Sequence, residues 1–124
     1  MVTAFKLKFG EVTIYDDHMI AVINEGYHVT IQTSHYLNDI AEKYFSDKPF
    51  VYVSHRKHQY SIDPSTYVEV AKIKNLLGVA IVSHEGIGIN NVALEKRFFP
   101  GSFKDFLNLK DARVWIRELM PVSS

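Results

Sequence analysis

Residues 50–64 read FVYVSHRKHQYSIDP, and this stretch decides the fold. Its first five residues are almost all apolar, which is typical of a strand buried on both faces of a parallel sheet. Asp63 and Pro64 then form the best helix start in the chain, because aspartate is a good N-cap and proline is tolerated in the first turn. A buried strand, a polar loop and a capped helix in this order predict a β-α unit of an α/β domain.

Downstream of this unit the same alternation continues. We expect a helix from Asp63 to about Leu77, ended by Gly78 in the left-handed conformation, then a buried strand over 79–83, a helix over 91–99, a short strand over 103–106 and a final helix that starts at Asn108. Asn108 and Asp111 stand at capping-box spacing at the start of that last helix. Strands separated by helices in this way imply right-handed crossovers and parallel pairing.

Upstream, the pattern predicts a small antiparallel meander followed by one helix. Strands are expected over 5–9, 12–15, 19–23 and 27–31, separated by turn signals. From Thr33 or Ser34 the period changes to that of a helix, which ends near Phe45. The fold class that follows is α/β: a mixed sheet of about five or six strands in a single domain, residues 1–124.

Composition excludes several function classes. The 124 residues are 47% hydrophobic, and 14 basic and 14 acidic side chains leave no net charge. Non-specific nucleic-acid binding needs a surplus of Lys and Arg, so we expect no nucleic-acid partner. No apolar run reaches the ~20 residues of a membrane span, so no integral membrane association is expected. Cysteine is absent and the first residues lack the layout of a signal peptide, which favours the cytoplasm.

Three stretches resemble the SpoIIAA-like family, which is related to STAS domains: FGEVTIYDDHMIAVINEG at 9–26, AEKYFSDKPFVYVSHRKHQYSIDPSTYVEVAKIKNLLGVAIVS at 41–83 and LEKRFFPGSFKDFLNLKDARVWIREL at 94–119. The resemblance implies a bacterial domain in which a β meander precedes right-handed β-α units. It also implies a regulatory or protein-interaction role rather than catalysis. In the wider group a phosphorylatable serine lies in an Asp-x-Ser-Gly motif. The matching stretch here lacks the Ser-Gly pair, so the nearby Ser61 and Ser65 are phospho-acceptor candidates outside the motif.

Five residues after the central strand form the candidate binding site: His55, Arg56, His58, Tyr60 and Ser61. They follow the carboxyl end of a strand, the edge at which open α/β sheets bind ligands, and they precede a helix N-terminus that attracts anions. Arg56 could hold such an anion through two hydrogen bonds. The alternative is a solvated loop, in which a cap carboxylate at the helix start competes for the same N–H groups.

Metal and catalytic sites have less support in the sequence. His55 and His58 lie on a loop without a cysteine or a fixed carboxylate partner, so no metal and no cofactor are predicted. Nucleophilic catalysis would need Ser54 to meet His84 across two strands, together with a third orienting group. The EGIGIN loop at 85–90 lacks the third glycine of a dinucleotide fingerprint and the lysine of a P-loop. We therefore expect a protein that is not an enzyme.

The central strands also bear on association and function. Residues 50–53 and 79–82 are apolar on both faces, and helices on one side only would leave the other face exposed. We expect that face to serve a homodimer or to border a small apolar pocket. The function expected from the sequence is a non-catalytic regulatory or protein-interaction domain with a protein partner. The alternative is a domain that binds a small apolar ligand or a lipid.

Overall fold

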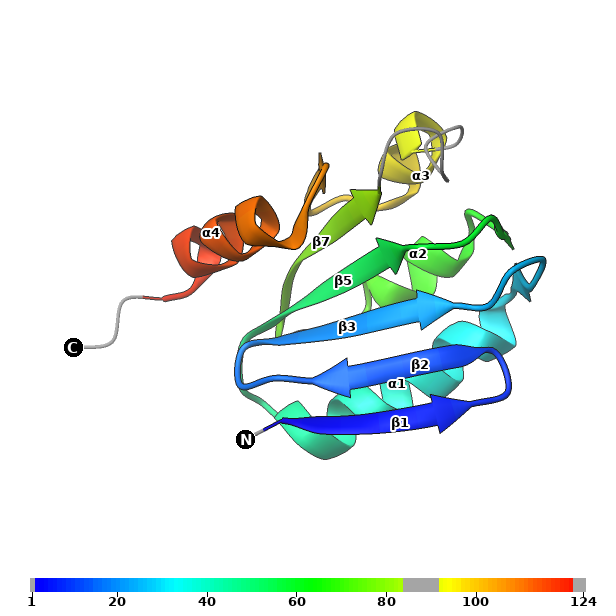
Figure 1. Ribbon diagram of the computed structural model, residues 1–124. Coiled ribbons are helices and arrows are strands. Elements are labelled where there is room, and N and C mark those ends of the chain that lie inside the picture. Colours follow the sequence, from blue (N-terminus) through cyan, green and yellow to red (C-terminus); the bar gives the residue numbers. More distant parts are fainter. Residues whose placement is uncertain (1, 84–91, 122–124) are drawn as a thin grey trace.

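The computed structural model describes residues 2–83 and 92–121 (Figure 1). In chain order the elements are β1 (Thr3–Leu7), β2 (Gly10–Ile14), β3 (His18–Ile23), β4 (His28–Val29), α1 (Ile31–Phe45), β5 (Phe50–Arg56), β6 (Ser61–Ile62), α2 (Thr66–Val70), β7 (Leu76–Ser83), α3 (Val92–Phe98), β8 (Ser102–Phe106) and α4 (Leu109–Leu119). Within the described part of the chain, no helix combines the length and the apolar character that crossing a membrane requires.

Six strands form one mixed sheet in the order β1-β2-β3-β5-β7-β8. Strands β1, β2 and β3 are antiparallel neighbours, whereas β3, β5, β7 and β8 run parallel. The predicted meander followed by parallel β-α units is therefore confirmed. Arg56 pairs with Ser83, so β5 and β7 end at the same edge of the sheet, as the sequence predicts.

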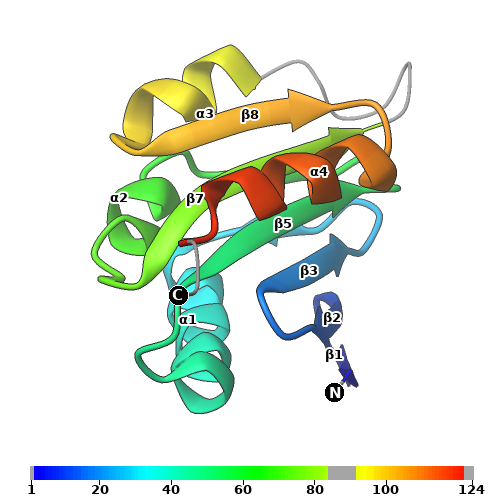
Figure 2. The same cartoon turned by 90° about the vertical axis from the view of Figure 1, so that its left-hand side faces the viewer.

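Helices cover both faces of this sheet (Figure 2). Helices α1, α2 and α3 lie on one face, and α4 lies on the other. Because side chains alternate along a strand, Tyr52 of β5 faces α1 and α2, while Val51 and Val53 face α4. Both valines are fully buried and pack in one cluster with Ala112 and Ile116 of α4.

This arrangement corrects the expectation of a homodimer through an exposed apolar sheet face. That expectation requires all helices to lie on one side of the sheet. Helix α4 instead covers the apolar side chains of β5 and β7, and Val51, Val53 and Ala80 have no exposed surface. A homodimer through some other surface stays a prediction.

The strand expected over 27–31 is reduced to β4, which pairs with β6, because helix α1 already begins at Ile31. Thr30 is the N-cap of α1, in place of the expected Thr33 or Ser34. The Thr30 hydroxyl accepts a hydrogen bond from the N–H of Thr33 at 3.4 Å, and the Thr33 hydroxyl accepts one from the N–H of Thr30 at 3.4 Å. This capping box fixes the start of the helix.

The helix expected over 63–77 is shortened to α2. Asp63 Oδ1 accepts hydrogen bonds from the N–H and the hydroxyl of Ser65, at 3.0 and 2.8 Å, and this local turn delays the start of the helix. After α2, the Asn75 side chain donates to two carbonyl oxygens in the turn that follows α1. These bonds hold the chain beside the start of β5, so β7 begins earlier than the sequence predicts.

Gly78, expected to end that helix, lies inside β7 instead. A Cβ atom at this position would come within 2.9 Å of the carbonyl oxygen of Ser102 in β8. Glycine is therefore required here for the close approach of a neighbouring strand and not for a left-handed backbone.

Candidate functional site

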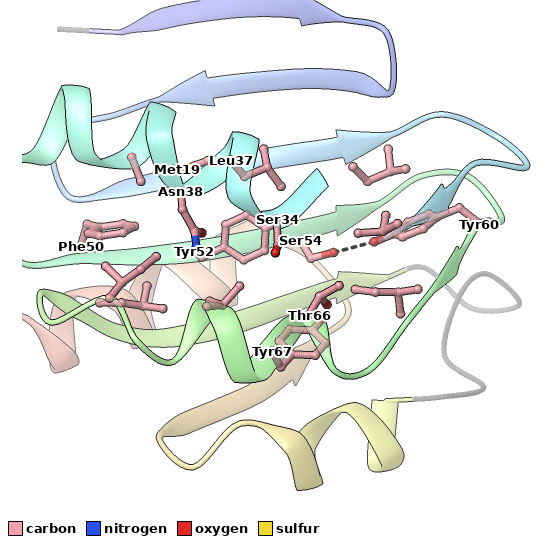
Figure 3. Close-up of a pocket in the computed structure, with 17 residues that line it drawn as sticks. Met19, Ser34, Leu37, Asn38, Phe50, Tyr52, Ser54, Tyr60, Thr66 and Tyr67 are labelled. Atoms are coloured by element: carbon pink, nitrogen blue, oxygen red, sulfur yellow. Dashed lines mark hydrogen bonds between the residues drawn. The ribbon is translucent and has the colours of Figure 1, made fainter. Parts of the chain in front are cut away.

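A small cavity of about 30 Å³ lies between the sheet and helices α1 and α2 (Figure 3). Its walls are mostly apolar, and hydroxyl groups gather toward the carboxyl end of β5. The apolar side chains are Met19, Ile23, Leu37, Ala41, Phe50, Val70, Ile73 and Leu76, among others, and the hydroxyl groups belong to Ser34, Ser54, Tyr52, Tyr60, Thr66 and Tyr67.

A buried ion pair lies next to the hydroxyl end of the cavity. Arg56, at the end of β5, donates from Nη1 to Glu95 Oε2 at 2.9 Å, and its Nη2 contacts Glu95 Oε1. Arg56 is 4% exposed and Glu95, on α3, is 0% exposed. Two parallel hydrogen bonds of this kind fix the orientation of both groups. The pair therefore holds α3 against the sheet.

Two tyrosines and a serine connect this pair to the cavity. The Tyr67 hydroxyl donates to Glu95 Oε1 at 2.6 Å and accepts from Arg56 Nη2 at 3.3 Å. The Ser54 hydroxyl lies 2.9 Å from that of Tyr60 and accepts a long hydrogen bond of 3.4 Å from Arg56 Nε. The Arg56 guanidinium also lies over the Tyr60 ring, 5.5 Å from its centre. The charged pair is thus surrounded by side chains that line the cavity.

Burial and these contacts set the protonation states. Burial raises the pKa of Tyr67 well above its usual value, and the negative charge of Glu95 acts in the same direction. Burial likewise raises the pKa of Tyr52. For Arg56 burial acts downward, but the hydrogen bonds to Glu95 and the interactions with neighbouring groups outweigh it, so its pKa is raised. Tyr52 and Tyr67 are therefore neutral and Arg56 is charged near neutral pH.

One hydroxyl group at the cavity has no hydrogen-bond partner among the described residues. Thr66, the first residue of α2, is 2% exposed, and its Oγ1 makes no hydrogen bond with any residue that the structure describes. Leaving a buried hydroxyl unpaired costs about 1–3 kcal/mol. Because Thr66 lines the cavity, a molecule inside it could supply the missing hydrogen bond.

The structure separates the five residues of the sequence-predicted binding site. Arg56 and Tyr60 lie together beside the cavity. His55 is 8% exposed and, as the strand neighbour of Arg56, points toward the opposite face of the sheet. His58 is exposed in the loop after β5. Ser61 is exposed in β6, and its hydroxyl lies 2.7 Å from a histidine ring in β4.

Arg56 has a partner other than the one expected. The sequence suggests an external anion for its two hydrogen bonds, and the structure supplies an internal one, Glu95. The helix start that would assist anion binding is also weaker than expected, because α2 has only 5 residues. Ligand binding by His55, Arg56, His58, Tyr60 and Ser61 together stays a prediction.

The two phospho-acceptor candidates lie in different surroundings. Ser61 is exposed, whereas Ser65 is partly buried and its hydroxyl donates to Asp63 at 2.8 Å. The hydrogen bonds from Ser65 lower the pKa of Asp63, so its carboxylate is charged near neutral pH. A phosphate on Ser65 would stand next to this like charge. Ser61 is the more accessible of the two, and phosphorylation at either residue stays a prediction.

Metal-ligating side chains do not cluster in the part of the chain that the structure describes. Residues 2–83 and 92–121 contain no cluster of three or more His, Asp or Glu side chains that could hold a metal ion. His84 and the EGIGIN loop at 85–90 lie outside the described residues, so the suggested pairing of Ser54 with His84 is not placed. The hydroxyl of Ser54 itself interacts with Tyr60 and Arg56.

Sequence reasoning missed Glu95 and Thr66 as site residues. A signal for Glu95 was available: it stands three residues after Val92 and four before Phe99, on the apolar side of a predicted helix. A carboxylate at such a position needs a buried cation. Thr66 offered no comparable signal, because threonine in the first turn of a helix is ordinary and its missing partner is a property of the packed structure.

The fold matches a solved structure. An uncharacterised protein of the DUF3478 family from Shewanella loihica PV-4, described as having a SpoIIAA-like fold, aligns with 94% of this chain and 92% of its own, with a TM-score of 0.51 and 16% sequence identity. No family model matches the sequence, and no curated protein is significantly similar to it. The chain therefore has a SpoIIAA-like fold, as its sequence predicts, and at this identity the likeness concerns the fold alone.

Proposed function

We propose that this chain is a non-catalytic binding domain that holds a small, mostly apolar molecule between the sheet and helices α1 and α2. One observation carries the proposal: a cavity with apolar walls contains a buried hydroxyl group, that of Thr66, without a partner among the described residues. Apolar walls with a few placed polar groups are the usual composition of small-molecule sites.

The polar groups beside the cavity support binding rather than catalysis. General-base catalysis needs a group that can take a proton from the reacting atom. The Ser54 hydroxyl has Arg56 beside it, a cation that cannot take a proton. The Glu95 carboxylate already accepts hydrogen bonds from Arg56 and from Tyr67. These contacts favour a role for the cluster in shaping the site.

The size of the cavity limits the ligand. Its volume of about 30 Å³ is a few times the ~10–15 Å³ that admits one water molecule. A molecule of about two or three heavy atoms suits this space, whereas an aromatic ring or a long acyl chain would require α1 and α2 to move apart. Of the ligand classes suggested by the sequence, the small apolar molecule is therefore favoured over the lipid.

Filling the cavity tests the proposal. Ala41 lies on α1, is 3% exposed and lines the cavity, so Ala41→Leu should occupy part of the space. We expect xenon to bind the wild type in xenon NMR and to raise its Tm, and we expect both effects to be lost in this variant. The matched control is Ala112→Leu, the same change at a buried alanine of α4 on the opposite face.

Ala112→Leu adds atoms to a filled core and should lower the free energy of unfolding by about 1–3 kcal/mol. Ala41→Leu extends into the cavity and should cost less, so the two variants separate loss of the cavity from loss of stability. Xenon binding that persists in Ala41→Leu, or that is absent from the wild type, would refute the proposal.

A regulatory role through a protein partner is the second candidate, and α3 supplies the observation that favours it. Leu94 and Phe98 are 43% and 38% exposed and stand four residues apart, so they share one face of the helix. A helix with such a face can dock on another protein. Glu95 lies between them in sequence and is bound to Arg56, which fixes the direction in which that face points.

Affinity purification from native cells, followed by mass spectrometry of proteins and small molecules, tests this second role. We expect the double change Leu94→Ser and Phe98→Ser to remove a protein partner that the wild type retains. Val114→Ser is the control, because Val114 is also an exposed apolar residue, 46% exposed, but lies on α4. If the wild type, the double variant and Val114→Ser all retain the same proteins, the result would argue against a partner at α3.

A further inference from the structure

A short two-stranded ladder places a serine beside a histidine outside the cavity. His28 of β4 is in register with Ser61 of β6, so the two side chains lie on the same side of the ladder. Ser61 Oγ lies 2.7 Å from His28 Nδ1, and both side chains are exposed. A serine nucleophile makes this contact with the general base that activates it.

The backbone holds the two strands of this ladder in register. The N–H of Ser61 donates to the carbonyl oxygen of Tyr27 at 3.0 Å. The N–H of Asp63 donates to the carbonyl oxygen of Val29 at 2.9 Å. The positions that carry the hydroxyl and the imidazole are therefore fixed by main-chain pairing, and the contact between them does not depend on two mobile segments meeting by chance.

The serine points away from the cavity of the proposed function. Tyr60 and Ile62, the two sequence neighbours of Ser61, both line that cavity. Because side chains alternate along an extended segment, Ser61 projects to the other side. A reagent in solvent can reach its hydroxyl without entering the cavity. The site formed by Ser61 and His28 is thus separate from the cavity and goes beyond the proposed function.

A carboxylate accompanies the serine and the histidine. Asp63 stands two residues after Ser61, and positions two apart in an extended segment share a side. Hydrogen bonds from Ser65 lower the pKa of Asp63, and a positive charge on His28 lowers it further. This attraction is mutual, so the Asp63 carboxylate stabilises the charge that His28 gains when it takes a proton from Ser61.

The same carboxylate favours one kind of transferred group over another. A phosphoryl group on Ser61 would add a charge of about −1.5 to −2 close to the negative charge of Asp63. An acyl group such as acetyl adds no charge to the serine. The electrostatics of this side of the ladder are therefore better suited to an acyl group.

We propose that Ser61 is a nucleophile that takes the acyl group of an activated ester, with His28 as its general base. With the ring proton of His28 on Nε2, Nδ1 accepts the hydroxyl proton of Ser61 while Oγ attacks the acyl carbon. The bond between Oγ and the acyl carbon forms, and the C–O bond of the ester breaks. Its electron pair departs with the leaving alkoxide or phenolate. The acyl group stays on Ser61, so the step modifies the chain and requires no turnover.

The reaction of the full chain with p-nitrophenyl acetate tests the proposal. Its leaving group, p-nitrophenolate, departs without taking up a proton. Acetylated residues are located and their rates of labelling measured by peptide mass spectrometry at neutral pH. We expect Ser61 to be acetylated at least ~10-fold faster than Ser65, whose hydroxyl donates to the Asp63 carboxylate instead. This factor is a modest part of what a positioned general base contributes.

His28→Gln distinguishes a base from a structural contact. Glutamine can still form a hydrogen bond with Ser61, but it cannot take a proton. Acetylation of Ser61 should therefore become at least ~10-fold slower in this variant. His58→Gln is the matched control, because His58 is also exposed but lies in the loop after β5, and it should leave the rate at Ser61 unchanged.

The outcomes that overturn the proposal are equally specific. Acetylation of Ser61 no faster than that of Ser65 would show that the hydroxyl is not activated. An unchanged rate in His28→Gln, or an equal loss of rate in His58→Gln, would show that His28 is not the base. Both histidines are exposed, so both variants should fold, and equal Tm values for the two variants and the wild type verify this.

Discussion

The two faces of the central sheet bury different kinds of side chain. The core cluster beneath α4 is apolar throughout and consists of Ile20, Val51, Val53, Ala80, Val82, Ala112 and Ile116. Beneath α1, α2 and α3 the core also contains an ion pair, two tyrosine hydroxyls and a threonine hydroxyl that has no partner in the described part of the chain. The same strand, β5, contributes to both faces, because its side chains alternate.

This difference agrees with the proposed position of the site under α1 and α2. Under α4 the parallel strands are covered mainly by apolar packing, with His18 and His55 as buried polar side chains on that face. A buried ion pair is a weak source of net stability, and apolar replacements of similar volume are often neutral or stabilising. Net stability therefore gives no strong reason for Arg56 and Glu95, which agrees with the proposal that they shape a binding site.

Glu95→Ala should give the largest loss of stability. It leaves the charge of Arg56, which is 4% exposed, without its principal partner. We expect the free energy of unfolding to fall by about 3–5 kcal/mol, measured by urea unfolding. The matched control is the double variant Arg56→Met and Glu95→Leu, which should recover most of the loss. A double variant as unstable as Glu95→Ala would show that the pair itself is required for the fold.

Ile116→Ala should destabilise the opposite face without affecting the site. Ile116 is 1% exposed and belongs to the apolar cluster beneath α4. The lost burial and the resulting cavity should lower the free energy of unfolding by about 2–4 kcal/mol in the same assay. The NMR signals of Thr66 and Tyr67 should keep their positions in this variant. Shifted signals would mean that the two faces are coupled.

A histidine on the α4 side should give the smallest effect, visible only as a function of pH. His18 is 6% exposed, its ring stacks on Tyr15 with centres 4.5 Å apart, and its Nδ1 lies 2.6 Å from an oxygen of Asp17. Burial lowers the pKa of His18, and the hydrogen bond with Asp17 offsets this only in part.

Because the folded pKa of His18 lies below the unfolded one, the unfolded chain binds more protons between the two values. The stability contributed by neutral His18 is therefore complete above the unfolded pKa of about 6.5 and is lost as the pH falls toward the folded pKa. We expect the free energy of unfolding of the wild type to decrease more between pH 7.5 and pH 5.5 than that of His18→Phe, which keeps the ring. Identical decreases in the two proteins would refute this assignment.

Most of the fold could be predicted from local patterns. Three features depend only on neighbours in sequence: the alternation in 5–9, the apolar runs at 50–53 and 79–82, and Asn108 as an N-cap. The structure contains both buried strands and the cap, and it places the first strand two residues earlier, at Thr3–Leu7. The end of α2 could not be predicted in this way, because Asn75 bonds to a turn that lies more than 25 residues earlier, at separations of 27 and 29.

The candidate site was predictable only in part for the same reason. The sequence predicts that Arg56 holds an external anion beside the sheet edge, whereas the structure shows it bound to the Glu95 carboxylate by two hydrogen bonds. The carboxylate lies 39 residues away on another helix, and no periodicity connects the two positions. The unpaired state of Thr66 depends on packing from several elements, so it has no signature in the sequence at all.

Because the Arg56–Glu95 pair is buried, the attraction between its two side chains should depend little on ionic strength. Mobile ions weaken attraction between charges that water reaches, and they act much less on charges enclosed by protein. The two side chains of this pair are 5% and 0% exposed, whereas those of the Lys72–Glu69 pair on the surface are 69% and 25% exposed. Added salt should loosen the second contact and leave the attachment of α3 to the sheet intact.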